Sequence, residues 1–433
     1  MKRILPALFV VVALLIVAAL VVRFNNYTIQ QPPTTLNIRP TLLIAENETA
    51  RSPLPTPLPT ATASALDNIR LGEPRVVFTH SSAIGVIEWL PNSQEVLLTL
   101  QQPDVLTETI ETLNITSGQR RLLAARASEP SRPIWLGKAD RLAYSMRPNP
   151  EEVVYELRFS GPSDDQSSQR PEGVDRIAPT ISGRGDRLLI VHNGQVRVLR
   201  IGPNDQSTEE SVIDLKDAGF DPDNWRTRFR SEWSSSGDKV ALYDTQGFAI
   251  LDLQSGLLRR YGLGEEQSEA YGYGPRWVYD ARWSPDGERI ALITTVGETD
   301  GTSLAYSDLT ILNTSTGDFA NQKIGRFVTD VAWLPDGYLL AVLAVLGIDQ
   351  VGVERQGLFL ADGMTSTAGH QLEFRQITSD YDFGGTWGMS LAWTSNRSML
   401  IVPCPRRLQQ NPPIVEARLC TIPADIKTRQ ENP

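Results

Sequence analysis

Two loops combine aromatic residues with glycine in a pattern that is typical of binding surfaces. The first covers residues 271–279 and the second covers residues 381–388. Large rings on exposed loops supply contact area for a partner when a rigid scaffold holds them. An alternative is that the same rings pack over the rim of the domain. The binding-face candidates are Tyr271, Tyr273, Trp277, Tyr279, Tyr381, Phe383 and Trp387.

Two carboxylates recur at the same distance from a tryptophan. Asp280 and Asp330 each precede their tryptophan, Trp283 or Trp333, by three residues. This spacing predicts that both side chains reach the mouth of a central channel in the fold argued below. A hydrolase or lyase could use such carboxylates, together with a glutamate or a metal ion. The alternative is a polar lining without chemistry.

Other catalytic patterns are missing from the sequence. It has no Gly-x-Ser-x-Gly elbow of a serine hydrolase. His80, His192 and His370 are far apart and have no acidic or nucleophilic neighbour pattern. Residues 221–224 resemble part of a calcium loop but lack its glycine and its final glutamate. We therefore expect no catalytic residue, no metal and no cofactor, and favour a protein that is not an enzyme.

The only two cysteines, Cys404 and Cys420, fall on strands that should be neighbours in the last repeat. In an exported protein they could form a cross-strand disulfide, which would close a loop of about 15 residues and add about 3 kcal/mol. Two separate buried thiols are an equally good alternative. Two cysteines exclude a disulfide-rich scaffold and a zinc site built from cysteines.

The charge balance argues against a nucleic-acid partner. The chain has 41 Lys and Arg against 51 Asp and Glu, a net charge of −10. Nucleic-acid binding requires clustered basic residues that neutralise phosphates. A protein, a peptide or a glycan is therefore the expected partner.

The amino terminus predicts a membrane anchor at residues 1–23. Ile4 to Val22 is a run of 19 residues without a charge, preceded by Lys2 and Arg3. This length matches the hydrocarbon core of a bilayer, and the basic residues favour a cytoplasmic amino terminus. We expect a single-pass signal anchor with the rest of the chain outside the cytoplasm; a cleaved signal peptide is the alternative.

A proline- and threonine-rich linker should follow the anchor. Residues 24–70 contain seven prolines, and residues 53–60 read Pro-Leu-Pro-Thr-Pro-Leu-Pro-Thr. Such a segment favours extended polyproline II structure without a core. We expect a disordered spacer that lifts the folded part off the membrane. Residues 425–433 should form a polar tail.

The remaining sequence repeats around one tryptophan. The clearest copies begin at Trp233, Trp283 and Trp333, and the copy at Trp283 reads Trp-Ser-Pro-Asp-Gly. Further copies are anchored at Trp89, Trp135, Ile181 and Trp393, which gives seven anchors spaced by 46 to 60 residues. A period near 50 residues indicates a repeat architecture. The anchors themselves should form the core between repeats, in preference to a stacking platform.

Each repeat contains four short strands separated by turns, with no helical periodicity. Pro-Asp-Gly suits a tight turn, and the strand after it is apolar on both faces, as expected between neighbouring sheets. We therefore predict an all-β fold, a seven-bladed β-propeller of four-stranded blades over residues 71–424. The last repeat lacks a fourth strand, which residues 75–80 should supply, so that the two ends of the ring are joined.

The Trp-Ser-Pro-Asp-Gly-x-x-Ile-Ala pattern of residues 283–291 resembles the WD40-like (PD40) repeat of TolB-type propellers. The resemblance covers about residues 75–422, and it implies a propeller. TolB-type proteins also have an amino-terminal α/β domain, which is missing here, so their role is not transferred.

Loop lengths suggest where this propeller would bind. The long connections and both aromatic loops should emerge on one face, because successive strands alternate in direction. We therefore favour a membrane-anchored, extracytoplasmic, non-enzymatic binding or scaffolding module that uses this long-loop face. The alternative is a propeller hydrolase or lyase with its site at the channel mouth.

Overall fold

The computed structural model describes residues 64–426 with internal gaps. The gaps are 92–93, 103–106, 128–131, 138–139, 148–154, 161–167, 170–178, 202–206, 221–228, 246, 264, 269–271, 298–303, 349–353, 364–371, 386–387 and 411–412. The predicted anchor (1–23), most of the predicted linker (24–70) and residues 427–433 lie outside the described residues. Within the described part, no helix is long and apolar enough to span a bilayer.

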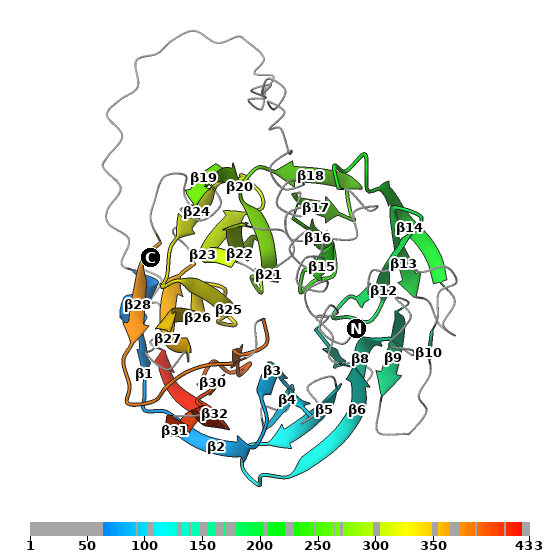
Figure 1. Cartoon of the computed structure of the whole chain (residues 1–433). Coiled ribbons are helices and arrows are strands. Elements are labelled where there is room, and N and C mark those ends of the chain that lie inside the picture. The colour runs from blue at the N-terminus through cyan, green and yellow to red at the C-terminus, as the bar shows by residue number, and fades with distance from the viewer. Residues whose placement is uncertain are drawn as a thin grey trace, which may run out of the picture. The chain divides into compact units, whose positions relative to one another are not determined.

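Seven antiparallel sheets surround a central axis, so the fold is a seven-bladed β-propeller, as predicted (Figure 1). Each of the first six blades contains four strands that run in chain order from the axis outwards. Blade 1 contains β3 (Ile84–Trp89), β4 (Glu95–Gln101), β5 (Thr107–Asn114) and β6 (Arg120–Ala127); blade 2 contains β7 (Ile134–Leu136), β8 (Arg141–Met146), β9 (Glu156–Ser160) and β10 (Ser168–Gln169); blade 3 contains β11 (Thr180–Ile181), β12 (Arg187–His192), β13 (Gln195–Ile201) and β14 (Ser207–Asp214).

The next three blades repeat this order. Blade 4 contains β15 (Arg230–Trp233), β16 (Lys239–Tyr243), β17 (Phe248–Asp252) and β18 (Leu257–Tyr261); blade 5 contains β21 (Trp277–Trp283), β22 (Arg289–Gly297), β23 (Leu304–Asn313) and β24 (Phe319–Gln322); blade 6 contains β25 (Phe327–Trp333), β26 (Leu339–Ile348), β27 (Glu354–Asp362) and β28 (Phe374–Ile377). A separate hairpin of β19 (Glu265–Ser268) and β20 (Gly272–Pro275) precedes blade 5.

Blade 7 is built from both ends of the described chain. Its later strands are β29 (Ala392–Trp393), β30 (Met399–Pro403) and β32 (Pro413–Ile426); β31 (Arg406–Gln410) forms a hairpin with the first part of β32. Its outer edge is formed by β1 (Ile69–Leu71) and β2 (Arg75–His80), which follow the 3₁₀ helix η1 (Ala65–Asn68). Figure 1 shows these early strands in blue beside β32 in red.

The pairing of β2 with β32 joins the two ends of the propeller. Arg75 lies opposite Thr421, and His80 lies opposite Ala417. Residues 75–80 therefore supply the outer strand that the last repeat lacks. Strand β1 extends the same edge, where Ile69 lies opposite Ile426. The sequence had not indicated β1, because only three residues form it.

The repeated turn after each anchor has the geometry that its sequence predicts. In blade 5 the amide of Gly287 donates to the carbonyl of Ser284 at 2.9 Å, and φ of Gly287 is 71°. This positive φ is accessible to glycine at little cost. Asp286 accepts from the amide of Glu288 at 3.0 Å, so the turn residues bind their own backbone. The turn explains this aspartate without a catalytic role.

The tryptophan anchors connect neighbouring blades. Trp283 donates its indole N–H to the carbonyl of Glu232 at 3.0 Å, and Trp333 donates in the same way to Arg282 at 2.9 Å. Each acceptor is the residue just before the anchor of the preceding blade. The anchors Trp89, Trp135, Trp233, Trp283, Trp333 and Trp393 are only 7–8% exposed. They are interblade core, as predicted.

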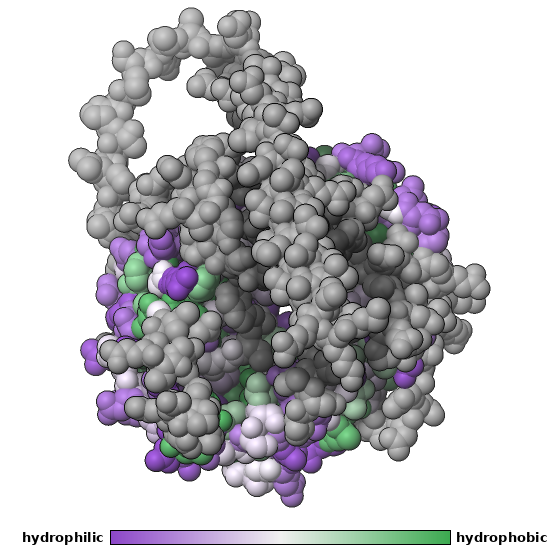
Figure 2. All heavy atoms as spheres, in the orientation of Figure 1, coloured by the Kyte–Doolittle hydropathy of each residue, from purple (hydrophilic) through white to green (hydrophobic). Residues whose placement is uncertain are grey.

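The outer strands carry the polar surface. Strand β14 is mostly exposed, and so is β18. Figure 2 shows hydrophilic side chains gathered over these two strands along the rim. The inner and middle strands supply the core, because they lie between the sheets of neighbouring blades.

Candidate binding pocket and central channel

A pocket of about 320 Å³ lies beside blade 7, which we call the blade-7 pocket. Five segments form it: the connection from β2 to β3, the start of β27, the connection from β28 to β29, the chain from β30 into β31, and the middle of β32. These are connections between second and third strands and connections into an inner strand. The pocket therefore belongs to the face that the sequence assigned to the long loops. Its lining consists of Ser81, Ser82, Ala83, Ile84, Arg355, Gln356, Asp382, Phe383, Gly384, Gly385, Pro403, Pro405, Arg407, Val415, Ala417 and Arg418.

Glycines allow the connection from β28 to β29 to approach blade 7 closely. Gly384 donates its amide to the carbonyl of Pro403 at 3.1 Å. A Cβ atom added at Gly385 would lie 2.2 Å from Oγ of Ser390, so a side chain there would force the connection away. Phe383 forms a bridge with Gln356 and is only 4% exposed, which fixes the same segment to blade 6. The pocket wall is thus held by backbone contacts on both sides.

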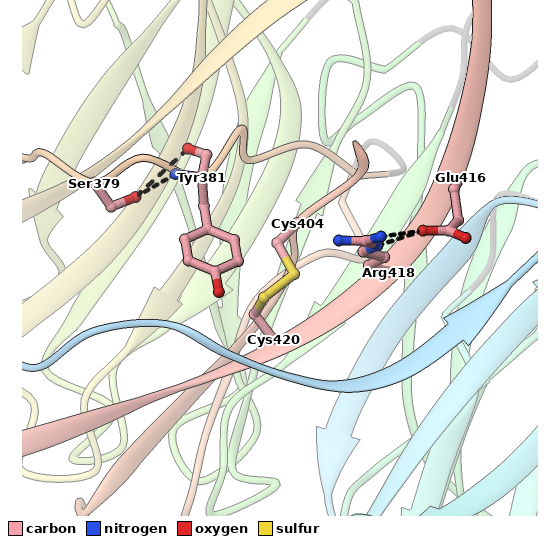
Figure 3. Close-up of a disulfide and its surroundings, with 6 residues drawn as sticks. All are labelled: Ser379, Tyr381, Cys404, Glu416, Arg418 and Cys420. Carbon is pink, nitrogen blue, oxygen red and sulfur yellow. Dashed lines mark hydrogen bonds and ion pairs between the residues drawn. A yellow bond between two sulfur atoms is a disulfide. The ribbon is translucent and has the colours of Figure 1, made fainter. Parts of the chain in front are cut away.

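A disulfide fixes the opposite wall. Cys404 and Cys420 are bonded, with their Cα atoms 5.7 Å apart, and the amide of Cys404 donates to the carbonyl of Arg418 at 2.9 Å. Figure 3 shows the bond between the two chain segments that also carry pocket residues, with the ring of Tyr381 directed toward it. Tyr381 is half-buried and packs against the core cluster that contains both cysteines. The disulfide therefore restrains the base of the β31–β32 hairpin.

The pocket lining is basic on balance. It contains three arginines, Arg355, Arg407 and Arg418, and one acidic residue, Asp382. Arg418 is paired with Glu416 at 2.5 Å, as Figure 3 shows. Arg355 is exposed, and its side chain makes no hydrogen bond or ion pair with a described residue. The pocket therefore has a positive side in a chain whose net charge is −10.

The predicted aromatic residues separate into two groups. Phe383 lines the blade-7 pocket, and Tyr381 packs against the core cluster beside it. Trp277 and Tyr279 lie in β21 of blade 5, with ring centroids 6.3 Å apart. Trp277 is only 4% exposed, and the guanidinium of Arg230 stands 5.2 Å from the Tyr279 ring. Trp277 and Phe383 are therefore buried beneath their loops. Tyr271 and Trp387 lie outside the described residues, as does the side chain of Tyr273.

Asp280 and Asp330 both lie in innermost strands, β21 of blade 5 and β25 of blade 6, where they pair with one arginine, Arg282. We call these three residues the channel group. The guanidinium of Arg282 is 2.8 Å from Asp280 and 3.8 Å from Asp330. Both strands have a bulge just before the aspartate, between Val278 and Asp280 and between Val328 and Asp330. A bulge turns a side chain away from the regular alternation, which explains why the two carboxylates meet the same arginine.

Asp330 also holds the loop that leads into blade 7. Its Oδ2 accepts from the amides of Ser390 at 2.6 Å and Leu391 at 2.9 Å, and its Oδ1 accepts from Val331 at 2.9 Å. Burial raises the pKa of Asp330, although Arg282 opposes this effect. The carboxylate therefore has a structural role. It accepts from backbone amides just before β29, which the two-residue strand itself does not include.

Arg282 and Gly388 complete this arrangement. Arg282 donates to the carbonyl of Gly388 at 2.6 Å. Gly388 has φ of 74°, and a Cβ atom there would lie 2.8 Å from Oδ2 of Asp280. Burial would lower the pKa of Arg282, but Asp280, Glu232 and Asp330 outweigh burial and raise it. The arginine remains charged and stabilises the group.

Further buried charged residues lie close enough to the channel group for its charges to act on their pKa. Burial raises the pKa of Glu232 to about 6, against the influence of Arg282 and Arg132. Burial likewise raises the pKa of Glu88, whose Oε1 accepts from the amide of Trp135 at 2.8 Å. Arg132 donates to the carbonyl of Ile87. The carboxylate of Glu232 makes no hydrogen bond with a described residue, so it is the least engaged acid of the channel.

The spacing of these residues from the tryptophan anchors is a signal in the sequence that points to them. Glu88, Glu232 and Arg282 each stand immediately before an anchor tryptophan, and Arg132 stands three residues before Trp135. These positions lie in or next to the inner strands of their blades, and the charges there act on one another's pKa. No group of three or more His, Cys, Asp or Glu side chains in the described part of the chain is arranged to hold a metal ion. Of the histidines, His80 ends β2 and accepts from the amide of Ser82 at 3.1 Å, His192 ends β12, and His370 is outside the described residues.

Comparisons with known proteins support the fold. No family model matches the sequence, and no curated protein matches it. A solved structure of an oligogalacturonate lyase in complex with manganese aligns with a TM-score of 0.50 at 10% identity, covering 82% of this chain and 98% of that chain. A protein from Lactobacillus plantarum aligns with a TM-score of 0.42 at 13% identity, covering 69% of this chain and 85% of that chain. At such identities the likeness concerns the fold alone.

Proposed function

We propose that this protein is a non-enzymatic binding module that takes a protein, peptide or glycan at its long-loop face. The observation that carries the proposal is the blade-7 pocket, which five separate segments build on that face. Concave sites with an apolar floor and a few convergent polar groups are the usual form of ligand sites. The disulfide and the close glycine contacts keep both walls in place before a ligand arrives, which reduces the cost of binding.

Location outside the cytoplasm, with residues 1–23 as a single-pass anchor, is part of the same proposal. It rests on the uncharged run from Ile4 to Val22 and on the basic residues before it. The bonded cysteines agree with an oxidising compartment. Protease added to intact cells should remove the propeller while leaving a membrane-bound stub.

The alternative, a hydrolase or lyase at the channel mouth, has less support. Asp280 and Asp330 are 6% and 1% exposed, and both are paired with Arg282. Asp330 accepts three backbone hydrogen bonds as well. A catalytic or metal-binding carboxylate needs lone pairs that face the reacting group, and these two have few left.

Photo-cross-linking from the two faces tests the proposal directly. A photoreactive residue is placed at Val415, which lines the pocket and is 43% exposed, or at Leu257, which is 54% exposed on the face of the short turns. In native envelopes of the expressing cell, Val415 should give a discrete adduct and Leu257 should not. Adducts from Leu257 alone, or equal adducts from both positions, would contradict the assignment of the face.

A further inference from the structure

The blade-7 pocket combines a basic side with an apolar floor. Besides Arg355 and Arg407, its lining contains Phe383, Pro403 and Pro405. Arg418 is largely neutralised by Glu416, but Arg355 has no described acidic partner. Beyond residue 70 the chain carries a net charge of −13, so this concentration of arginine is not a property of the surface as a whole.

Arginine beside apolar surface selects a particular ligand chemistry. A guanidinium binds carboxylate through two parallel hydrogen bonds and is less strongly hydrated than an ammonium group. A cavity of about 320 Å³ is at the small end of ligand sites, so it accommodates a compact group. Proline and phenylalanine would cover an apolar body while the arginines meet a negative charge at its end.

An unsatisfied acceptor adds a second requirement. Oε1 of Gln356 is buried and has no hydrogen-bond partner among the described residues. Gln356 lines the pocket and lies close to Gly384, where an added Cβ would be 3.8 Å from Nε2 of the same amide. Such a buried acceptor costs about 1–3 kcal/mol. Turning the Gln356 amide into the pocket would let a donor N–H from a ligand recover this cost.

We infer that the blade-7 pocket binds a carboxylate attached to a small apolar body. This deepens the proposed function and rests on it for the choice of face. Two sources share the chemistry, namely the carboxyl-terminal end of a peptide and a free organic acid. Only the peptide also brings an amide N–H for Gln356.

Three probes separate these sources in titrations of the full-length protein in detergent. They are acetyl-alanyl-leucine with a free carboxylate, the same compound as its carboxyl-terminal amide, and 4-methylpentanoate, which has the leucine body without an amide. The acid should bind at least about tenfold more tightly than the amide, because a charge-assisted hydrogen bond is lost. Stronger binding of the dipeptide acid than of 4-methylpentanoate would assign a peptide end; equal binding of the two would assign an organic acid.

Substitutions locate the binding. Arg355→Gln and Arg407→Gln should each weaken binding of the acid by about tenfold, while Arg121→Gln, at an exposed position of β6, should leave it unchanged. Thermal unfolding verifies that the variants remain folded. Equal binding of acid and amide, no binding of either acid, or wild-type affinity in both pocket variants would overturn the inference. If Val415 still gives its adduct in that case, the proposed face survives and only the ligand class fails.

Discussion

Trp89 donates its indole N–H to the carbonyl of Ala392 at 3.1 Å, across 303 residues of sequence. Ala392 stands just before the anchor Trp393. The bond therefore has the same form as those of Trp283, Trp333 and Trp393, which each donate to the carbonyl just before the anchor of the preceding blade. It connects the first blade to the last. Together with the pairing of β2 and β32, it gives the propeller closure at both the inner and the outer strand.

Replacing Trp89 by phenylalanine should therefore cost more than the same change at another anchor. Trp135 is the matched control, because it is 7% exposed but its indole nitrogen bonds to no described residue. Both variants lose the same volume, and only Trp89→Phe removes a hydrogen bond between the indole and a described residue of the neighbouring blade. We expect it to be less stable than Trp135→Phe by about 1–2 kcal/mol in urea unfolding. Equal losses would show that the interblade bond contributes nothing.

Asp330 should behave as a structural residue. Asp330→Ala removes the acceptor of three backbone amides at 2.6–2.9 Å, which should lower the free energy of unfolding by about 3 kcal/mol. Asp330→Asn keeps one acceptor oxygen and should lose less. The exposed Asp217 provides a control, since Asp217→Ala should have an effect within about 0.5 kcal/mol. An unchanged stability of Asp330→Ala would reopen a ligand-binding role for this carboxylate.

Glu232 should make stability depend on pH. Its pKa is raised from 4.5 to about 6 in the folded protein. Between these values the folded state holds a proton that the unfolded state has lost, so stability falls as pH rises, by at most about 2 kcal/mol. Glu232→Gln mimics the protonated form and should be more stable than the wild type above pH 6.

Below pH 4.5 the difference between this variant and the wild type should disappear, because both states of the wild type are then protonated. Urea unfolding at a series of pH values measures it. A constant difference across the range would show that Glu232 does not titrate in this window.

The disulfide should stabilise the hairpin that forms one pocket wall. Cys404 and Cys420 are separated by 16 residues, for which the chain-entropy model gives about 3 kcal/mol. The double variant Cys404→Ala/Cys420→Ala should lose about this amount and should resemble the wild type treated with reductant. If the variant were as stable as the oxidised wild type, other contacts of blade 7 would suffice to hold the hairpin.

The sequence predicted the repeat and its closure because both depend on local patterns. The spacing of the tryptophans, the Pro-Asp-Gly turn and the orphan strand at residues 75–80 are visible without knowledge of distant contacts. The adjacency of Cys404 and Cys420 belongs to the same group, because both lie within one repeat, but the sequence left open whether the two thiols are bonded.

Less of the candidate site could be predicted from the sequence, and the reason is physical. Arg355, Arg407 and Phe383 come together only because three segments converge, namely the start of β27, the start of β31 and the connection from β28 to β29. Such convergence follows no periodic pattern of the sequence. The burial of Trp277 and the engagement of Asp330 likewise depend on segments far away along the chain. The charges at Glu88 and Glu232 could have been found, since they occupy the fixed position before an anchor.

Hydrogen exchange of the full-length protein, with and without acetyl-alanyl-leucine, tests the central claim that the long-loop face contains the binding site. The account predicts added protection of amides in residues 81–85, 383–385 and 404–408, which line or border the blade-7 pocket. Little change should occur in the short turns at residues 253–256 and 313–317 of the opposite face. Protection confined to those turns, or to the channel strands around Glu232, would contradict it.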